Sequence, residues 1–292
     1  MLTEEQLEIR KTGIGASESA VILGFSKWKT PAEIFYEKTG VLTDDVTSEA
    51  AHFGNVLEET VAQEYARRKD CKVRRNNKTL RHKDHPFILC HLDRVVKGEK
   101  RIVECKTSSA YLADKWGEEG TAMVPEEYLI QVQHQMAITD YEVADIPVLI
   151  GGNQLKIYTV ERDQELIDII IDNLTYFWKE NILKGVAPDF DYDHSTTEKL
   201  LKKLHAGTDG SETDLIEYEA WHSVRQEALA NVKTYQAVAD GAKNHILTAM
   251  GDSAIGFISG AGSYNRKLVK RKAFEVSASE SIRLSFKKEA KK

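Results

Sequence analysis

The chain has 292 residues, of which 41% are hydrophobic and 29% charged, and its formal net charge at pH 7 is -6. This length can bury a sizeable core, and the negative charge argues against a protein that simply coats nucleic acid. The three cysteines, Cys71, Cys90 and Cys105, form no Cys-x-x-Cys pair, which excludes a disulfide framework and a four-cysteine cluster. No basic-then-apolar leader opens the sequence and no apolar run has membrane-spanning length, so we expect a soluble cytoplasmic protein without a membrane partner.

Helix caps and breakers predict four helices in the first quarter of the chain. Thr3 caps a helix that runs through Arg10, and the next two are expected from Ser17 to near Gly24 and from Thr30-Pro31 to Gly40. A longer amphipathic helix follows over residues 48–69. Its expected apolar side consists of Phe53, Val56, Leu57, Val61 and Tyr65.

A basic run follows the long helix. Nine Lys or Arg accompany one Asp between Arg67 and Lys83, and ten accompany three Glu from Arg266 to Lys292. Such runs are compatible with a basic track for a polyanion on an otherwise acidic surface. The alternative is a solvated face or, for the C-terminal run, a disordered tail.

The next two apolar runs predict a β-hairpin that gathers polar side chains. Residues 87–93 end at Asp93, and after a turn-like segment residues 101–106 end in Glu104-Cys105-Lys106. Glu104 and Lys106 leave one face of the strand, whereas Cys105 points to the other. Two carboxylates beside an ammonium are suited to hold Mg²⁺ and to position a water for attack on a phosphodiester. Taken alone, the motif is equally an exposed hairpin with cross-strand ion pairs.

The remaining pattern predicts an α/β core and an extension. A helix is expected over residues 124–139, strands over 143–150 and 154–160, and a helix over 163–184. This order indicates a mixed sheet flanked by helices that ends near Pro188. Residues 212–250 read as one long helix or a helical pair, and short strands broken at Gly260 and Gly262 follow up to residue 286. We therefore expect a core domain over residues 1–188 and an extension of helix and short strands, without assigned chemistry, over 189–292.

Further polar residues lie at telling positions. Glu58 follows Gly54 by one helical turn, and glycine allows another segment to approach closely. Gln131 and Gln135 are four apart and share a helix face. Because glutamines on helices are usually solvated, we expect Gln133 and Gln135 to be exposed.

The tract from Arg10 to Ser19 combines a guanidinium, small residues and hydroxyls at a predicted helix N-terminus. Such an arrangement could bind a phosphate. The alternative is an ordinary serine cap beside an incidental arginine.

These fragments, in this order, resemble the PD-(D/E)XK nucleases of the YqaJ viral recombinase group, which are lambda-exonuclease-like. The resemblance covers about residues 10–184 and implies a restriction-endonuclease-like fold. It rests on Arg10 with Ala16-Ser17-Glu18, Gly54 with Glu58, Asp93 with Glu104-Cys105-Lys106, Tyr128 with Gln131 and Gln133, and Glu161-Arg162-Asp163.

The resemblance implies an Mg²⁺-dependent enzyme, with Mn²⁺ as a substitute, that digests one strand of linear double-stranded DNA processively from a 5′-phosphorylated end. Such an enzyme leaves a 3′ single strand for a phage-type annealing protein, works in a bacterial or phage-infected cell, and often forms a ring trimer. Asp93, Glu104 and the Cys105 carbonyl would bind the metal, with Glu58 completing the site directly or through water. Lys106 would orient or activate the attacking water, and Gln131 would help to hold the site and the scissile strand. The 5′ phosphate would lie against Arg10, Ser17 and Ser19.

Two other readings share this motif. An endonuclease or a RecB-like nuclease module would have Asp93, Glu104 and Lys106 without needing Arg10 and Ser17. A catalytically idle DNA-binding clamp is the alternative that is not an enzyme. The chain also departs from the pattern at Ala51, where a relative carries an apolar residue that wedges the duplex open.

Overall fold

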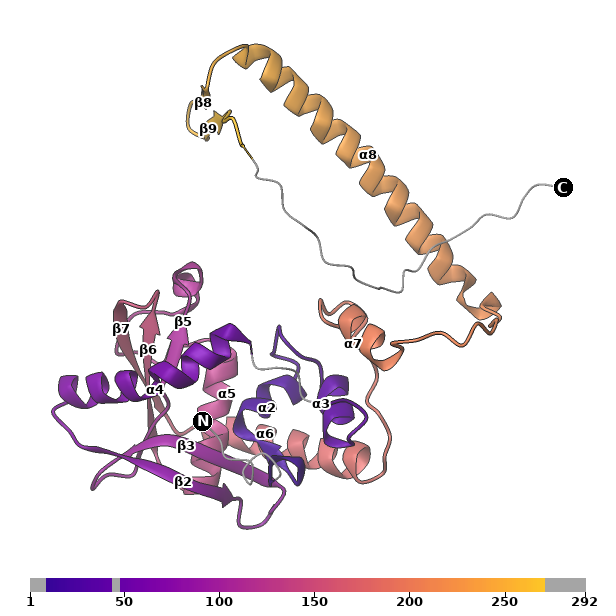
Figure 1. Ribbon diagram of the computed structural model, residues 1–292. Helices are drawn as coiled ribbons and strands as arrows, with labels where there is room; N and C mark the ends of the chain where they lie inside the picture. The colour runs from indigo at the N-terminus through magenta and orange to yellow at the C-terminus, as the bar shows by residue number, and fades with distance from the viewer. Residues whose placement is uncertain (1–8, 44–47, 271–292) are drawn as a thin grey trace. The chain divides into compact units, whose positions relative to one another are not determined.

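The computed structural model describes residues 9–43 and 48–270 (Figure 1). The described residues fall into two compact units, which are divided between Ala206 and Gly207. The first helix expected from Thr3 therefore lies mostly outside the described residues. The first unit ends beyond the expected boundary at residue 188, because helix α7 (Thr197–Leu204) belongs to it. Leu200 of α7 is buried, and Lys203 Nζ lies 3.3 Å from Glu33 Oε1.

A mixed sheet of seven strands is the framework of the first unit. Its central order is β1 (Ile14–Gly15), β3 (Ile88–Val96), β4 (Arg101–Val103), β6 (Val143–Ile150) and β5 (Lys106–Ser108), while β2 (Val73–Arg81) pairs with β3 and β7 (Gln154–Glu161) with β6. The pairs β1–β3, β4–β6 and β5–β6 are parallel, and the other three are antiparallel. The α/β prediction is confirmed.

Helices cover both faces of this sheet. On one face α2 (Ala16–Ile22), α5 (Glu126–Thr139) and α6 (Gln164–Tyr176) contact one another, and α6 continues as a π-helical turn over Phe177–Ile182. Helix α3 (Pro31–Lys38) packs on α2, and a 3₁₀ turn (Ala110–Lys115) follows β5. On the other face α4 (Glu49–Arg68) buries Val61 and Tyr65 against Val96 and Val103. Strands β3, β4 and β5 are thus held between α4 and α5.

Local signals located several elements correctly. The Thr30 side chain caps α3 as expected, and α4 begins at the expected place, where the Ser48 side chain caps it. Arg94 pairs with Val103 in the predicted hairpin. Other expectations were wrong. Ser17 lies inside the first turn of α2, whose N-cap is Gly15. On α4, Phe53 and Val56 are about half exposed, so they do not belong to the buried side of this helix.

The basic run between Arg67 and Lys83 contains strand β2, which the sequence analysis missed. Its pattern of burial does not alternate, because two register shifts interrupt its pairing with β3, between Arg75 and Asn76 and between Asn76 and Leu80. Bulges of this kind bend a strand and redirect its side chains, often next to a functional site.

A proline explains why β4 and β5 are separate strands. Val103 pairs with Asp145 and Lys106 with Val148, so the register with β6 is unbroken across Glu104 and Cys105. The Glu104 N–H donates to the Asp145 carbonyl at 2.9 Å. In a parallel ladder the next N–H of β6, on residue 147, would bond the Glu104 carbonyl, but Pro147 has no N–H. The ladder is therefore interrupted at the Glu-x-Lys motif.

Residues 212–250 were expected to form either one long helix or a helical pair. The described part of the second unit shows one long helix there. A short 3₁₀ turn (Ile216–Tyr218) leads into α8 (Glu219–Met250), and the strands β8 (Ile255–Ile258) and β9 (Gly262–Asn265) form a hairpin. Gly260 has φ +76° in its turn, which explains the glycine there. The strands expected beyond residue 270 lie outside the described residues. Within the described part of the chain, no helix is long and apolar enough to cross a membrane.

A buried carboxylate ties α4 to the sheet. Asp145 of β6 is 1% exposed and accepts hydrogen bonds from the Tyr65 hydroxyl at 2.6 Å and the Thr159 hydroxyl at 2.8 Å. Arg101 Nη1 donates to the same carboxylate at 3.0 Å. The Tyr65 bond is the link that reaches α4, the helix that carries Glu58.

We predict that Tyr65→Phe lowers the free energy of unfolding by about 2 kcal/mol, because it removes a buried hydrogen bond to a charged group. Urea unfolding followed by circular dichroism measures this change. Tyr176→Phe is the matched control: this tyrosine is 67% exposed, so its loss should cost less than about 0.5 kcal/mol. Equal stability of Tyr65→Phe and wild type would contradict the role given to this bond.

Candidate active site

The Glu104 carboxylate lies at the centre of a buried hydrogen-bond network. It is 3% exposed, and its Oε1 accepts from Lys106 Nζ at 2.8 Å and from Gln131 Nε2 at 2.6 Å. Its Oε2 accepts from Gln135 Nε2 at 2.8 Å. One strand and one helix thus fix this carboxylate from three directions.

The two other glutamine predictions on α5 were wrong. Gln133 and Gln135 were expected to be exposed, but each is 1% exposed. Gln135 bonds Glu104, whereas Gln133 donates to the Glu161 carbonyl at 2.7 Å and so links α5 to the end of β7. The spacing of four between Gln131 and Gln135 was the available signal, since it places both on the face that carries the network.

Lys106 remains protonated in this network. Its Nζ donates to Glu104 and, at 3.0 Å, to Gln131 Oε1, and it lies 4.9 Å from the centre of the Tyr128 ring. Burial alone would lower the pKa of Lys106, but attraction to Glu104 and Asp93 outweighs it and raises this pKa to about 12. A lysine held this way can polarise a water molecule as a cation but is a poor general base.

Asp93 of β3 lies next to this network. Its Oδ2 accepts a hydrogen bond from the Cys105 N–H at 2.9 Å. Removal from bulk water raises the pKa of Asp93 to about 8, and repulsion from Glu104 adds to the effect. A cation beside the two carboxylates would relieve that repulsion and favour their charged forms.

Glu58 reaches the same region from α4 and is held by Arg94. Arg94 Nη1 donates to Glu58 Oε1 at 2.6 Å, and Arg75 Nη2 lies 3.5 Å from the same oxygen. Arg94 was missed by the sequence analysis. The signal in the sequence was a charged residue at position 94, between Asp93 and the apolar pair Val95-Val96.

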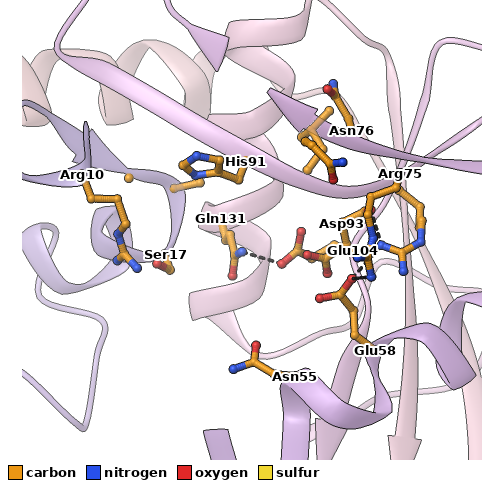
Figure 2. A pocket seen from close by; sticks show the side chains of 15 residues that line it. Arg10, Ser17, Asn55, Glu58, Arg75, Asn76, His91, Asp93, Glu104 and Gln131 are labelled. Atoms are coloured by element: carbon orange, nitrogen blue, oxygen red, sulfur yellow. Dashed lines mark hydrogen bonds and ion pairs between the residues drawn. The ribbon is translucent and has the colours of Figure 1, made fainter. Parts of the chain in front are cut away.

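One cleft of about 210 Å³ brings most of these groups together. Figure 2 shows Glu58, Asp93 and Glu104 pointing into a common space, with Gln131 beside them. The cleft lining also includes residues that the sequence analysis did not single out for the site: Asn55, Arg75, Asn76, Asn77, His91 and Arg94.

Arg10 and Ser17 also line this cleft, and Figure 2 shows both to the left of the three carboxylates. Arg10 Nη2 lies 3.3 Å from Glu18 Oε1, and the Gly15 N–H at the start of α2 donates to Glu18 Oε2 at 2.7 Å. Ser17 is exposed. The two residues therefore remain candidates for contact with a phosphate.

The expectation for Ser19 was wrong. Its side chain is fully buried, and its hydroxyl lies 2.6 Å from His134 Nδ1. Residues 17 and 19 are two apart on a helix, so they point in different directions. Ser19 therefore joins α2 to α5 and is not available to a phosphate.

The donor groups fit a hard divalent cation. Asp93 and Glu104 offer carboxylate oxygens, which Mg²⁺ and Mn²⁺ prefer, and the cysteine thiols take no part. Within residues 9–43 and 48–270, no three side chains of His, Cys, Asp or Glu gather closely enough to hold a metal by themselves. An ion at Asp93 and Glu104 would therefore need backbone carbonyls, waters or substrate oxygens to complete its shell.

Comparisons with known proteins identify the family and the fold of this chain. The YqaJ-like viral recombinase domain matches residues 5–142. Two structures of the alkaline exonuclease LHK-Exo from Laribacter hongkongensis share the fold. The first has a TM-score of 0.53 at 20% identity, and the match covers 70% of this chain and 98% of that one. The second has a TM-score of 0.52 at 19% identity, and the match covers 69% of this chain and 100% of that one. The uncharacterized protein YqaJ of Bacillus subtilis (strain 168) is 40% identical over 263 residues, which cover 88% of this chain and 81% of that protein. The chain therefore belongs to the YqaJ-like viral recombinase family.

Proposed function

We propose that this protein is a metal-dependent exonuclease that digests one strand of linear double-stranded DNA from a 5′-phosphorylated end. The observation that carries the proposal is the shared cleft: the Asp93 and Glu104 carboxylates line it together with Arg10 and Ser17. The first pair suits phosphodiester hydrolysis and the second suits a terminal phosphate. Support also comes from the fold, which is that of an alkaline exonuclease solved in complex with dAMP.

The metal-binding residues in this proposal are Asp93, Glu104 and the Cys105 carbonyl, with Glu58 acting through water. The Cys105 N–H points to Asp93, and in an extended strand the N–H and C=O of one residue point to the same side. The Cys105 carbonyl is therefore expected on the Asp93 side as well. A bound Mg²⁺ or Mn²⁺ would neutralise charge on the scissile phosphate and lower the pKa of a bound water.

Lys106 and Gln131 have supporting tasks. Lys106 is a fixed cation that can orient the attacking water and offset charge that develops on the phosphate. Gln131 donates to Glu104 and accepts from Lys106, so it keeps the carboxylate and the ammonium in one geometry. In this role Lys106 neither gains nor loses a proton during cleavage.

Arg10 would set the polarity of digestion. A guanidinium forms paired, charge-assisted hydrogen bonds with a terminal phosphate, whereas Ser17 offers one neutral donor. Processive digestion, a ring trimer around the duplex and transfer of the 3′ strand to an annealing protein rest on the family resemblance alone. We include these three features in the proposal on that ground.

The decisive experiment compares three substrates. With Mg²⁺, we predict rapid digestion of linear duplex with 5′ phosphates, slower digestion with 5′ hydroxyls, and no cleavage of a closed circle. Excess chelator should abolish activity, and Mn²⁺ should restore it, because the oxygen donors fit both ions. Cleavage of the circle would favour the endonuclease alternative, and DNA binding without cleavage of any substrate would favour the idle clamp.

We predict that Glu104→Gln reduces the rate of digestion by at least about 100-fold, because it removes a metal ligand and a transition-state contact. The change keeps the shape of the side chain but replaces one acceptor oxygen by a donor, so circular dichroism must first show that the variant is folded. Glu126→Gln is the matched control, because Glu126 is an exposed carboxylate on the same helix as Gln131. Wild-type turnover by Glu104→Gln would refute the assignment of the active site.

We predict that Arg10→Ala selectively slows digestion of 5′-phosphorylated ends, and that Ser17→Ala has a smaller effect of the same kind. The measurement is the ratio of rates on phosphorylated and hydroxyl ends for each variant. Arg67→Ala removes an exposed guanidinium from α4 and should leave that ratio unchanged. An equal loss on both end types in Arg10→Ala, or digestion from 3′ ends, would overturn the end-recognition model.

A further inference from the structure

Arg94 is a buried guanidinium that directly follows the metal-binding candidate Asp93. It is 3% exposed and makes three short contacts: 2.6 Å to Glu58 Oε1, 2.6 Å to Glu59 Oε2 and 2.5 Å to the Asp93 carbonyl. A guanidinium withdrawn from water requires anionic partners. Both of its carboxylate partners come from α4, so Arg94 clamps this helix to strand β3.

This clamp changes the charge of the cleft. Of the three carboxylates that line it, Glu104 is paired with Lys106 at 2.8 Å and Glu58 with Arg94 at 2.6 Å. The Asp93 carboxylate accepts a hydrogen bond from the Cys105 N–H, which is neutral and does not offset its charge. A divalent cation therefore meets a site in which much of the negative charge is already offset.

We propose that Arg94 is a positioning residue that acts through Glu58, holding this carboxylate at the edge of the cleft and offsetting its charge. The ion is then bound chiefly by Asp93 and Glu104, and Glu58 reaches it through water. Without Arg94, Glu58 keeps only its longer contact of 3.5 Å with Arg75 and can turn toward the ion, so the site binds metal more tightly but in a less productive geometry. This inference rests on the proposed function, since it assigns a metal to the same cleft.

The test is the dissociation constant for Mn²⁺ in the absence of DNA, measured by titration calorimetry. Arg94→Met should tighten binding on the order of tenfold, equivalent to about 1.4 kcal/mol. The double variant Arg94→Met with Glu58→Gln should return to near the wild-type value, because the tightening operates through Glu58. In Arg94→Met, turnover at saturating Mn²⁺ should fall although the metal binds better, a divergence that simple loss of folded protein does not produce.

Two further variants make the result specific. Arg67→Met removes a guanidinium from α4, the helix that carries Glu58. There Arg67 pairs with Glu64, and its loss should leave the Mn²⁺ affinity unchanged. Arg94→Lys keeps the charge, but one ammonium cannot replace both guanidinium bonds. It should show a smaller tightening, and it serves as the test if Arg94→Met does not fold.

Several outcomes would overturn the inference. They are unchanged or weaker Mn²⁺ binding in both Arg94 variants, tightening that persists in the double variant, and absence of Mn²⁺ binding by the wild type. The affinity is measured without DNA, so it separates the two proposals. If the metal results hold but the wild-type protein cleaves no DNA, the proposed function fails and the role of Arg94 stands.

Discussion

The arrangement of the site depends on the need to keep one carboxylate charged inside the protein. Glu104 is almost completely buried, and a buried carboxylate is costly unless both of its oxygens accept hydrogen bonds. Lys106, Gln131 and Gln135 meet that requirement. Two of these donors come from one turn of α5, so burying Glu104 also fixes α5 against strands β4 and β5. The site and the packing of the fold are therefore consequences of one electrostatic constraint.

A second constraint comes from the sheet itself. Pro147 interrupts the ladder of β6 opposite the Glu-x-Lys motif, because it offers no N–H to the Glu104 carbonyl. The Cys105 N–H faces the opposite edge of this segment and bonds the Asp93 side chain of β3. On the other face, the Asp145 network of β6 holds α4, and Arg94 of β3 clamps the same helix, with β4 between these two strands. The positions of Asp93 and Glu58 thus depend on bonds to neighbouring strands and helices.

The sequence revealed the parts of this site that are close along the chain. Asp93, Glu104 and Lys106 could be predicted as neighbours because a hairpin is a local structure. Strand β2 was missed because its bulges remove the alternation on which strand prediction depends. The burial of Gln135 and Ser19 could not be foreseen, because each is decided by a partner more than 30 positions away, Glu104 and His134 respectively. Arg94 is a similar case, since its two carboxylate partners, Glu58 and Glu59, precede it by 36 and 35 residues.

The proposed function requires that Asp93 and Glu104 together hold a divalent cation in the cleft. Anomalous diffraction from crystals grown with Mn²⁺ measures this directly, because the metal position is located without reference to activity. We expect a peak at about 2.0–2.2 Å from one carboxylate oxygen of each residue, the usual range for a small hard divalent ion. A well-ordered crystal in millimolar Mn²⁺ with no peak there, or with its metal bound elsewhere in the cleft, would refute this metal site.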